Sequence, residues 1–210
     1  EDSRPWAEII RQWSTFHPEF NWLPRKFKIA VTGATKDRAA IQVHDIGVRI
    51  HRDGERLSFD ILAGGGLGRT PVIAPIIKVG LEPLHLLTYL EAILRVYNRY
   101  GRRDNKYKAR IKILVRAMTP EIFAQKVEEE WATLKDGRAT LTESEIDRVK
   151  SFFTMPAYEQ LDDHVAEVDD RLADNSGFIA WLKQNIKPHK QPGYSIVNLA
   201  LKSTSIAPGD

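Results

Sequence analysis

"LPRKFKIAV", residues 23–31, is the stretch around which the chain is organised. Pro24 disfavours a continuing helix and suits the first residue of a strand. Beyond it, apolar and cationic residues alternate, which is typical of a strand with one buried face. Because successive side chains on a strand point to opposite faces, Lys26 and Lys28 share one face, about 6–7 Å apart, while Phe27 can enter a core.

Two ammonium groups at that spacing repel each other, so the pair needs an explanation. A basic edge strand provides the structural one, since exposed lysines discourage edge-to-edge pairing of sheets. The functional alternative is that Lys26 and Lys28 both face one bound anion.

Composition limits the possible classes of protein. The 210 residues suffice for one large domain, or one domain plus pieces, and 42% apolar with 28% charged residues is ordinary for a soluble globular protein. No apolar run approaches the roughly 20 residues of a membrane span, and the absence of a secretory signal favours the cytoplasm. A start at Glu1 without Met indicates a segment cut from a longer protein. The lack of cysteine excludes disulfides, thiolate zinc sites, a cysteine nucleophile and a cysteine-held iron–sulfur cluster within these residues.

Charge is unevenly distributed along the chain. Residues 1–120 hold 21 Lys and Arg against 12 Asp and Glu, whereas residues 121–170 hold 5 against 14. The first part should therefore attract an anion and the acidic stretch should not.

The periodicity predicts an α+β fold with a mixed sheet flanked by helices. A turn at Asp53-Gly54 should join two strands as a hairpin. The predicted strands are Lys26–Gly33, Ala39–Ile50 with a bulge at His44-Asp45, Leu57–Ala63 and Tyr194–Leu201. The predicted helices are Pro5–Phe16, Pro83–Tyr100, one beginning at Thr119-Pro120, one with a Thr142/Glu145 capping box that ends near Phe153, and Phe178–Ile186.

Four segments are expected from these patterns. They are an N-terminal helical lead-in (1–20), the main domain (21–153), an acidic helical connector (154–190) and the truncated start of a further domain (191–210).

Glycines are concentrated at 64–68, followed by Arg69. The run is neither a Walker loop nor a dinucleotide fingerprint, because the required Lys and third Gly are absent. A flexible turn is the ordinary interpretation. The functional one is that Gly64, Gly65 and Gly66 let the backbone approach a large flat ligand while Arg69 supplies charge.

Four blocks in this order resemble the sirohaem-dependent nitrite and sulfite reductases: "LPRKFKIAV" (23–31), "IQVHDIGVRI" (41–50), "ILAGGGLGRTP" (61–71) and "YGRRDNKYKARIKILV" (100–115). The resemblance extends from about residue 4 to residue 135. The last 20 residues resemble the start of that family's second ferredoxin-like half-domain. The chain therefore looks like a central fragment of the haemoprotein.

The resemblance implies an oxidoreductase that reduces sulfite to sulfide, or nitrite to ammonia, by six electrons at a sirohaem coupled to a 4Fe-4S cluster. It implies catalytic roles for Lys26 and Lys28, which would neutralise the anion and deliver protons. The implied cofactor-binding residues are Arg25, His44, Gly64, Gly65, Gly66, Arg69, Asn105, Arg110 and Lys112. It places no metal ligand in this chain.

The family's cluster cysteines are missing here and are expected in the rest of the reductase polypeptide. The electron donor would be ferredoxin or a flavoprotein, and no membrane partner is implied. The isolated chain is expected to lack catalysis.

Two other functions remain open on sequence grounds. The basic run at 95–116, with interleaved tyrosines, is usually a solvated helix face but could bind nucleic acid. That alternative leaves the LPRKFK and glycine blocks unexplained. A purely structural, degenerate domain is the third possibility.

Overall fold

The computed structural model of this chain describes residues 1–162, 165–166, 168, 170 and 175–199. The chain divides into two compact units, residues 1–154 and residues 155–210.

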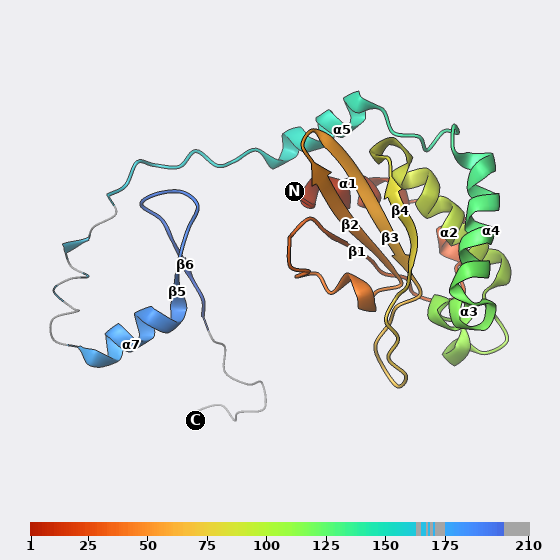
Figure 1. Cartoon of the computed structure of the whole chain (residues 1–210), viewed down its shortest axis with the longest axis horizontal. Coiled ribbons are helices and arrows are strands. Elements are labelled where there is room, and N and C mark those ends of the chain that lie inside the picture. The colour runs from red at the N-terminus through yellow and green to blue at the C-terminus, as the bar shows by residue number, and fades with distance from the viewer. Residues whose placement is uncertain (163–164, 167, 169, 171–174, 200–210) are drawn as a thin grey trace. The chain divides into compact units, whose positions relative to one another are not determined.

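A mixed four-stranded sheet forms the centre of the first unit (Figure 1). Its order is β1-β2-β3-β4, with β1 parallel to β2 and the other neighbours antiparallel. The strands are β1 (Ile29–Thr32), β2 (Ile46–Asp53), β3 (Arg56–Ala63) and β4 (Ile76–Leu81). This confirms the predicted α+β class with a mixed sheet.

The hairpin between β2 and β3 forms where the sequence predicts it. Asp53 lies opposite Arg56, and Gly54 between them adopts a φ of 58°. A glycine takes that left-handed conformation without the steric cost that a Cβ would bring.

The helices of the first unit pack on one face of the sheet or beside one another (Figure 1). They are α1 (Arg4–Ser14), α2 (Leu86–Tyr100), α3 (Ile111–Met118), α4 (Pro120–Leu134) and α5 (Glu143–Lys150). Short 3₁₀ turns occupy Phe20–Trp22, Ile41–Val43, Pro83–His85, Lys106–Lys108 and Ser151–Phe153. Half of the predicted capping box is present: the Thr142 side chain accepts a hydrogen bond from the Glu145 amide, whereas the Glu145 carboxylate accepts from Arg148.

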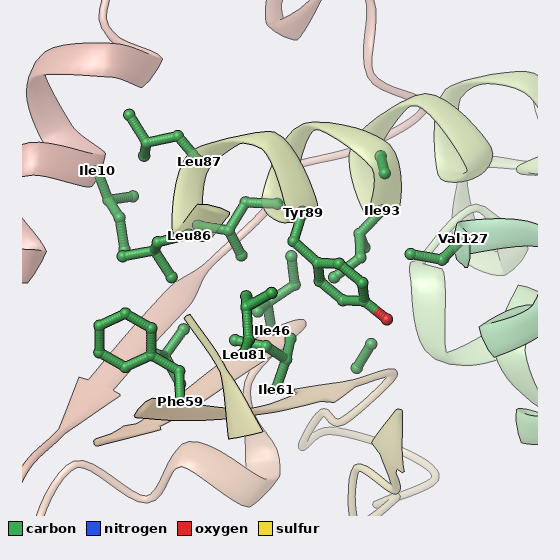
Figure 2. Packing of buried hydrophobic residues seen from close by; sticks show 14 of the residues in the cluster. Ile10, Ile46, Phe59, Ile61, Leu81, Leu86, Leu87, Tyr89, Ile93 and Val127 are labelled. Carbon is green, nitrogen blue, oxygen red and sulfur yellow. The ribbon is translucent and has the colours of Figure 1, made fainter. Parts of the chain in front are cut away.

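The core lies between the sheet and α1 and α2. Figure 2 shows Leu86, Tyr89 and Ile93 of α2 pointing towards the sheet. In the same core, the Trp6 ring of α1 packs edge-on against Phe59 of β3, with ring centroids 4.8 Å apart. These buried apolar faces supply the main driving force for folding of this unit.

Two strand predictions need correction. β1 begins at Ile29 instead of Lys26, so residues 26–28 lie outside the strand. The predicted strand Ala39–Ile50, with its bulge, is a 3₁₀ turn followed by β2 from Ile46. The cause is local: the Asp37 carboxylate accepts hydrogen bonds from the amides of Ala39 and Ile41 and turns the chain.

The second unit contains α7 (Ser176–Asn185), β5 (Ile186–Pro188) and β6 (Ser195–Val197). β5 and β6 pair antiparallel. The predicted helix at 178–186 is thus present with shifted ends, and the predicted strand Tyr194–Leu201 appears over 195–197; residues 200 and 201 lie outside the described residues. The four predicted segment boundaries stay predictions.

Candidate functional site

The cationic segment, residues 23–28, directly precedes β1, and both of its lysines, Lys26 and Lys28, are exposed. Between them, the Phe27 ring packs against Tyr97 of α2, with centroids 5.4 Å apart. Within the part of the chain that the structure describes, neither Lys26 nor Lys28 uses its ammonium group in a hydrogen bond or ion pair. Arg25 is half-buried and donates to the carbonyl of Lys106. Two free cations therefore project from a backbone held by an apolar anchor.

Asp45 lies beneath this segment and is only 1% exposed. Its Oδ2 accepts the Lys28 amide at 3.0 Å, and its Oδ1 accepts Nε and Nη2 of Arg110 at 3.1 and 2.6 Å. The next amide, that of Ile46, donates to the Lys28 carbonyl at 3.1 Å. The Lys28 peptide groups are thus held from both sides.

The glycine segment, Gly64 to Gly66, is buried and packed, whereas Gly68 beyond it is exposed. The Gly64 amide donates to the Asp45 carbonyl at 2.9 Å. A Cβ on Gly65 would lie 2.4 Å from the Gln42 carbonyl oxygen, and one on Gly66 would lie 3.1 Å from Cδ of Lys112. Here, glycine permits close approach of this chain's own segments.

Lys112 secures the loop that follows. Its side chain is buried, and its Nζ donates to the carbonyls of Thr70 and Leu67 at 2.6 and 3.3 Å. Burial, reinforced by the neighbouring Arg110, lowers the pKa of the Lys112 amine below its ordinary value. Arg69 lies on this loop and is exposed.

The other predicted contact residues make local hydrogen bonds. His44 pairs through Nδ1 with the Ala40 carbonyl at 2.9 Å. Asn105 accepts the Tyr107 amide at 2.9 Å and caps a 3₁₀ turn. The structure therefore joins Lys28, Gly64 and Arg110 through Asp45, whereas His44 and Asn105 are engaged separately.

Sequence reasoning did not single out Asp45, which lies at the centre of these contacts. A signal was available, because this acid directly precedes the buried run of β2 in a region with excess cations. A carboxylate at such a position needs a cationic or amide partner if it is to be buried.

The basic run at 95–116 is not a continuous helix, since α2 ends at Tyr100 and α3 begins at Ile111. Much of its charge is used internally. Arg95 pairs with Glu91 at 2.7 Å, and Arg99 pairs with Glu130 at 3.2 Å. Arg103 donates to the Trp22 carbonyl at 2.9 Å. These contacts argue against the nucleic-acid surface considered from the sequence.

A groove of about 690 Å³ lies beside the cationic segment. Apolar side chains of α1 and residues 20–29 contribute to its lining, together with Arg25 and Lys26. Among the described residues, no group of three or more His, Asp or Glu is placed to hold a metal ion, and no helix is long and apolar enough to cross a membrane.

Residues 1–135 match the family described as the nitrite and sulphite reductase 4Fe-4S domain. A sulfite reductase (ferredoxin) 1 of Mycolicibacterium paratuberculosis is 32% identical over 141 residues, which are 66% of this chain and 25% of that protein. A ferredoxin–nitrite reductase of Leptolyngbya laminosa is 31% identical over 116 residues, or 54% of this chain and 22% of that protein.

The solved structure of Mycobacterium tuberculosis NirA protein is similar to this chain with a TM-score of 0.55 and 28% sequence identity. The similarity covers 65% of this chain and 25% of NirA. The chain thus spans about a quarter of the length of these relatives. The family match over residues 1–135, together with the fold and the order of its sequence blocks, shows that this chain belongs to the nitrite and sulphite reductase 4Fe-4S domain family.

Proposed function

We propose that this chain supplies the sirohaem- and anion-facing part of a sulfite or nitrite reductase. The observation that carries the proposal is the pair of exposed ammonium groups of Lys26 and Lys28, which have no partner among the described residues. The Lys28 backbone is held by hydrogen bonds at both its amide and its carbonyl. Because the chain spans about a quarter of its relatives, the complete reaction belongs to a larger protein.

The chemistry of the side chains fits a carboxylate-rich tetrapyrrole. Such a ring needs several cationic and N–H donors around its edge. Arg110 retains N–H groups beyond those donated to Asp45, and Lys112 has three donors, of which two are used by the loop carbonyls. The proposed contacts to the cofactor are Arg25, His44, Gly64, Gly65, Gly66, Arg69, Asn105, Arg110 and Lys112.

Sirohaem, when bound, supplies the iron at which sulfite or nitrite is reduced by six electrons. The residues of this chain bind and orient the anion. The ammonium groups of Lys26 and Lys28 offset its negative charge and donate hydrogen bonds to its oxygens. They also hold protons where those oxygens leave as water.

A 4Fe-4S cluster does not fit this chain, because cluster ligation by thiolates requires cysteine and the sequence contains none. We therefore place the cluster ligands in the remainder of the reductase. The same remainder would receive electrons from ferredoxin or a flavoprotein. We further propose that the enzyme works in the cytoplasm.

The test is a titration of the chain with sirohaem, followed by visible absorption. Saturable binding that Lys26→Ala plus Lys28→Ala weakens at least about tenfold would support the proposed site; tenfold corresponds to about 1.4 kcal/mol. Lys135→Ala plus Lys150→Ala is the charge-matched control, because both lysines are exposed, Lys135 just after α4 and Lys150 at the end of α5. Equal weakening by both pairs would indicate a general charge effect. Absence of binding, both by this chain and by a reductase containing it, would contradict the proposal.

A further inference from the structure

We propose that Asp45 is a positioning residue for the anion-binding face. Its carboxylate holds the Lys28 main chain and thereby directs the Lys28 ammonium group. This inference rests on the proposed function, and it assigns a role to a residue that does not itself face the anion.

The first support is the geometry around Lys28. The Lys28 amide donates to Asp45 Oδ2 at 3.0 Å, and its carbonyl accepts from the Ile46 amide at 3.1 Å. The second bond is the first rung of the parallel β1–β2 pairing, whereas the first bond holds the Lys28 amide just upstream of β1 with a side chain. The direction of the Lys28 side chain therefore depends on the carboxylate as well as on the sheet.

The second support is the charge balance of the carboxylate. At 1% exposure Asp45 has almost no access to water, so its charge must be met by protein groups. Arg110 provides two N–H donors to Oδ1, leaving Oδ2 for Lys28. The Asp45 charge also acts on two neighbouring groups. It opposes the lowering of the pKa of the buried Lys112 amine, and it helps raise the pKa of the Tyr97 hydroxyl.

The third support is that Asp45 joins three of the sequence blocks. Its side chain reaches the cationic segment and Arg110, and its carbonyl accepts the Gly64 amide at 2.9 Å. Asp45 thereby fixes the position of the segment bearing Lys28 relative to the glycine segment and to the start of α3. Such support matters because a displacement of about 1 Å in a binding group can cost a factor of about 100 in rate.

If Asp45 only stabilised the fold, replacing it would weaken every contact to the ligand. If Asp45 positions Lys28, replacing it would weaken ligand binding through Lys28 alone. Asp45→Asn separates these roles, because its single amide oxygen can take only one of the positions of Oδ1 and Oδ2, and the NH₂ group at the other position cannot accept a hydrogen bond. We expect hydrogen exchange at the Lys28 amide to become about tenfold faster, as expected when one hydrogen bond is lost.

Sirohaem binding gives the second measurement. Asp45→Asn should raise the dissociation constant, but in a Lys28→Ala background it should change the constant by no more than about twofold, since coupled residues are non-additive. Additive effects would overturn the inference. So would unchanged exchange at the Lys28 amide in folded Asp45→Asn.

Asp60→Asn is the matched control. Asp60 is also buried on the sheet, but it accepts from the Gly80 amide at 3.1 Å and contacts His51. Its replacement should leave the Lys28 amide unchanged. If Asp45→Asn does not fold, Arg110→Gln provides the second variant, because it removes the guanidinium group that holds Oδ1 of Asp45. It too should accelerate hydrogen exchange at the Lys28 amide. A folded Arg110→Gln with unchanged exchange would overturn the inference.

The two hypotheses fail separately. A wild-type chain and a larger reductase that both fail to bind sirohaem would overturn the proposed function. Amide exchange at Lys28 would still decide whether Asp45 holds that segment.

Discussion

The Arg110 guanidinium lies 2.6 Å from Oδ1 of Asp45 and joins the start of α3 to the start of β2. The two residues are 65 positions apart in sequence. Since Asp45 is almost completely buried, this ion pair differs from the exposed pairs on the helices. Asp45 also accepts hydrogen bonds from the Lys28 amide of the cationic segment and from the Gly64 amide of the glycine segment.

Arg110→Met is expected to lower the free energy of unfolding by about 3–5 kcal/mol, because it leaves a buried carboxylate without its cation. Urea denaturation of the folded chain measures this. Arg102→Met, which breaks an exposed pair with Asp104, should change stability far less, because water and salt screen that pair. Similar losses in both variants would contradict the special role of the buried pair.

Gly65→Ala and Gly66→Ala test the packing of the glycine segment. The new Cβ at Gly65 meets the backbone oxygens of Gln42 and His44 at 2.4 and 2.6 Å, whereas that at Gly66 meets side-chain Cδ of Lys112 at the longer distance of 3.1 Å. We expect Gly65→Ala to cost at least about 3 kcal/mol and Gly66→Ala clearly less. Thermal unfolding compares them. A Gly65→Ala variant as stable as Gly66→Ala would show that the segment is loosely packed.

Because of Tyr97, the free energy of unfolding of the first unit should fall as pH rises in the alkaline range. Burial, together with the Asp45 charge, raises the pKa of the Tyr97 hydroxyl from 10.0 to about 12. A raised pKa in the folded state means that the folded chain retains a proton which the unfolded chain releases, so this contribution is complete below pH 10 and is lost between pH 10 and 12. The loss should be about 2–3 kcal/mol.

Tyr97→Phe removes that dependence. At pH 7 the variant should be less stable by about 1 kcal/mol, since the hydroxyl donates to the Ala109 carbonyl at 2.7 Å. At pH 12 the difference should shrink or reverse. Denaturation curves at the two pH values measure the change, and parallel behaviour of both proteins would contradict the raised pKa.

Thr142→Ala should destabilise the first unit by about 1 kcal/mol, because the Thr142 hydroxyl caps α5 by accepting the Glu145 amide at 3.2 Å. Thr142→Ser keeps the oxygen and should retain most of the stability. Chemical denaturation of the three proteins decides this, and an Ala variant as stable as Ser would exclude a capping contribution.

Local patterns predicted the elements whose signals lie within a few residues of one another. The Asp53-Gly54 turn, the Pro120 helix start and the Thr142 cap appear where the sequence places them. The 3₁₀ turn at Ile41–Val43 was missed because the Asp37 side chain competes with strand pairing, and alternation of apolar residues carries no information about that competition.

The sequence by itself determined the alternation that exposes Lys26 and Lys28 and turns the half-buried Phe27 towards the core, because that pattern follows from backbone geometry over three residues. Only the tertiary structure decided that Asp45 lies beneath them and that Arg110 and Gly64 meet it. Those contacts join residues far apart in the chain, and their stability comes from removing a charge from water and matching it with specific donors. Neither effect is visible in local composition or periodicity.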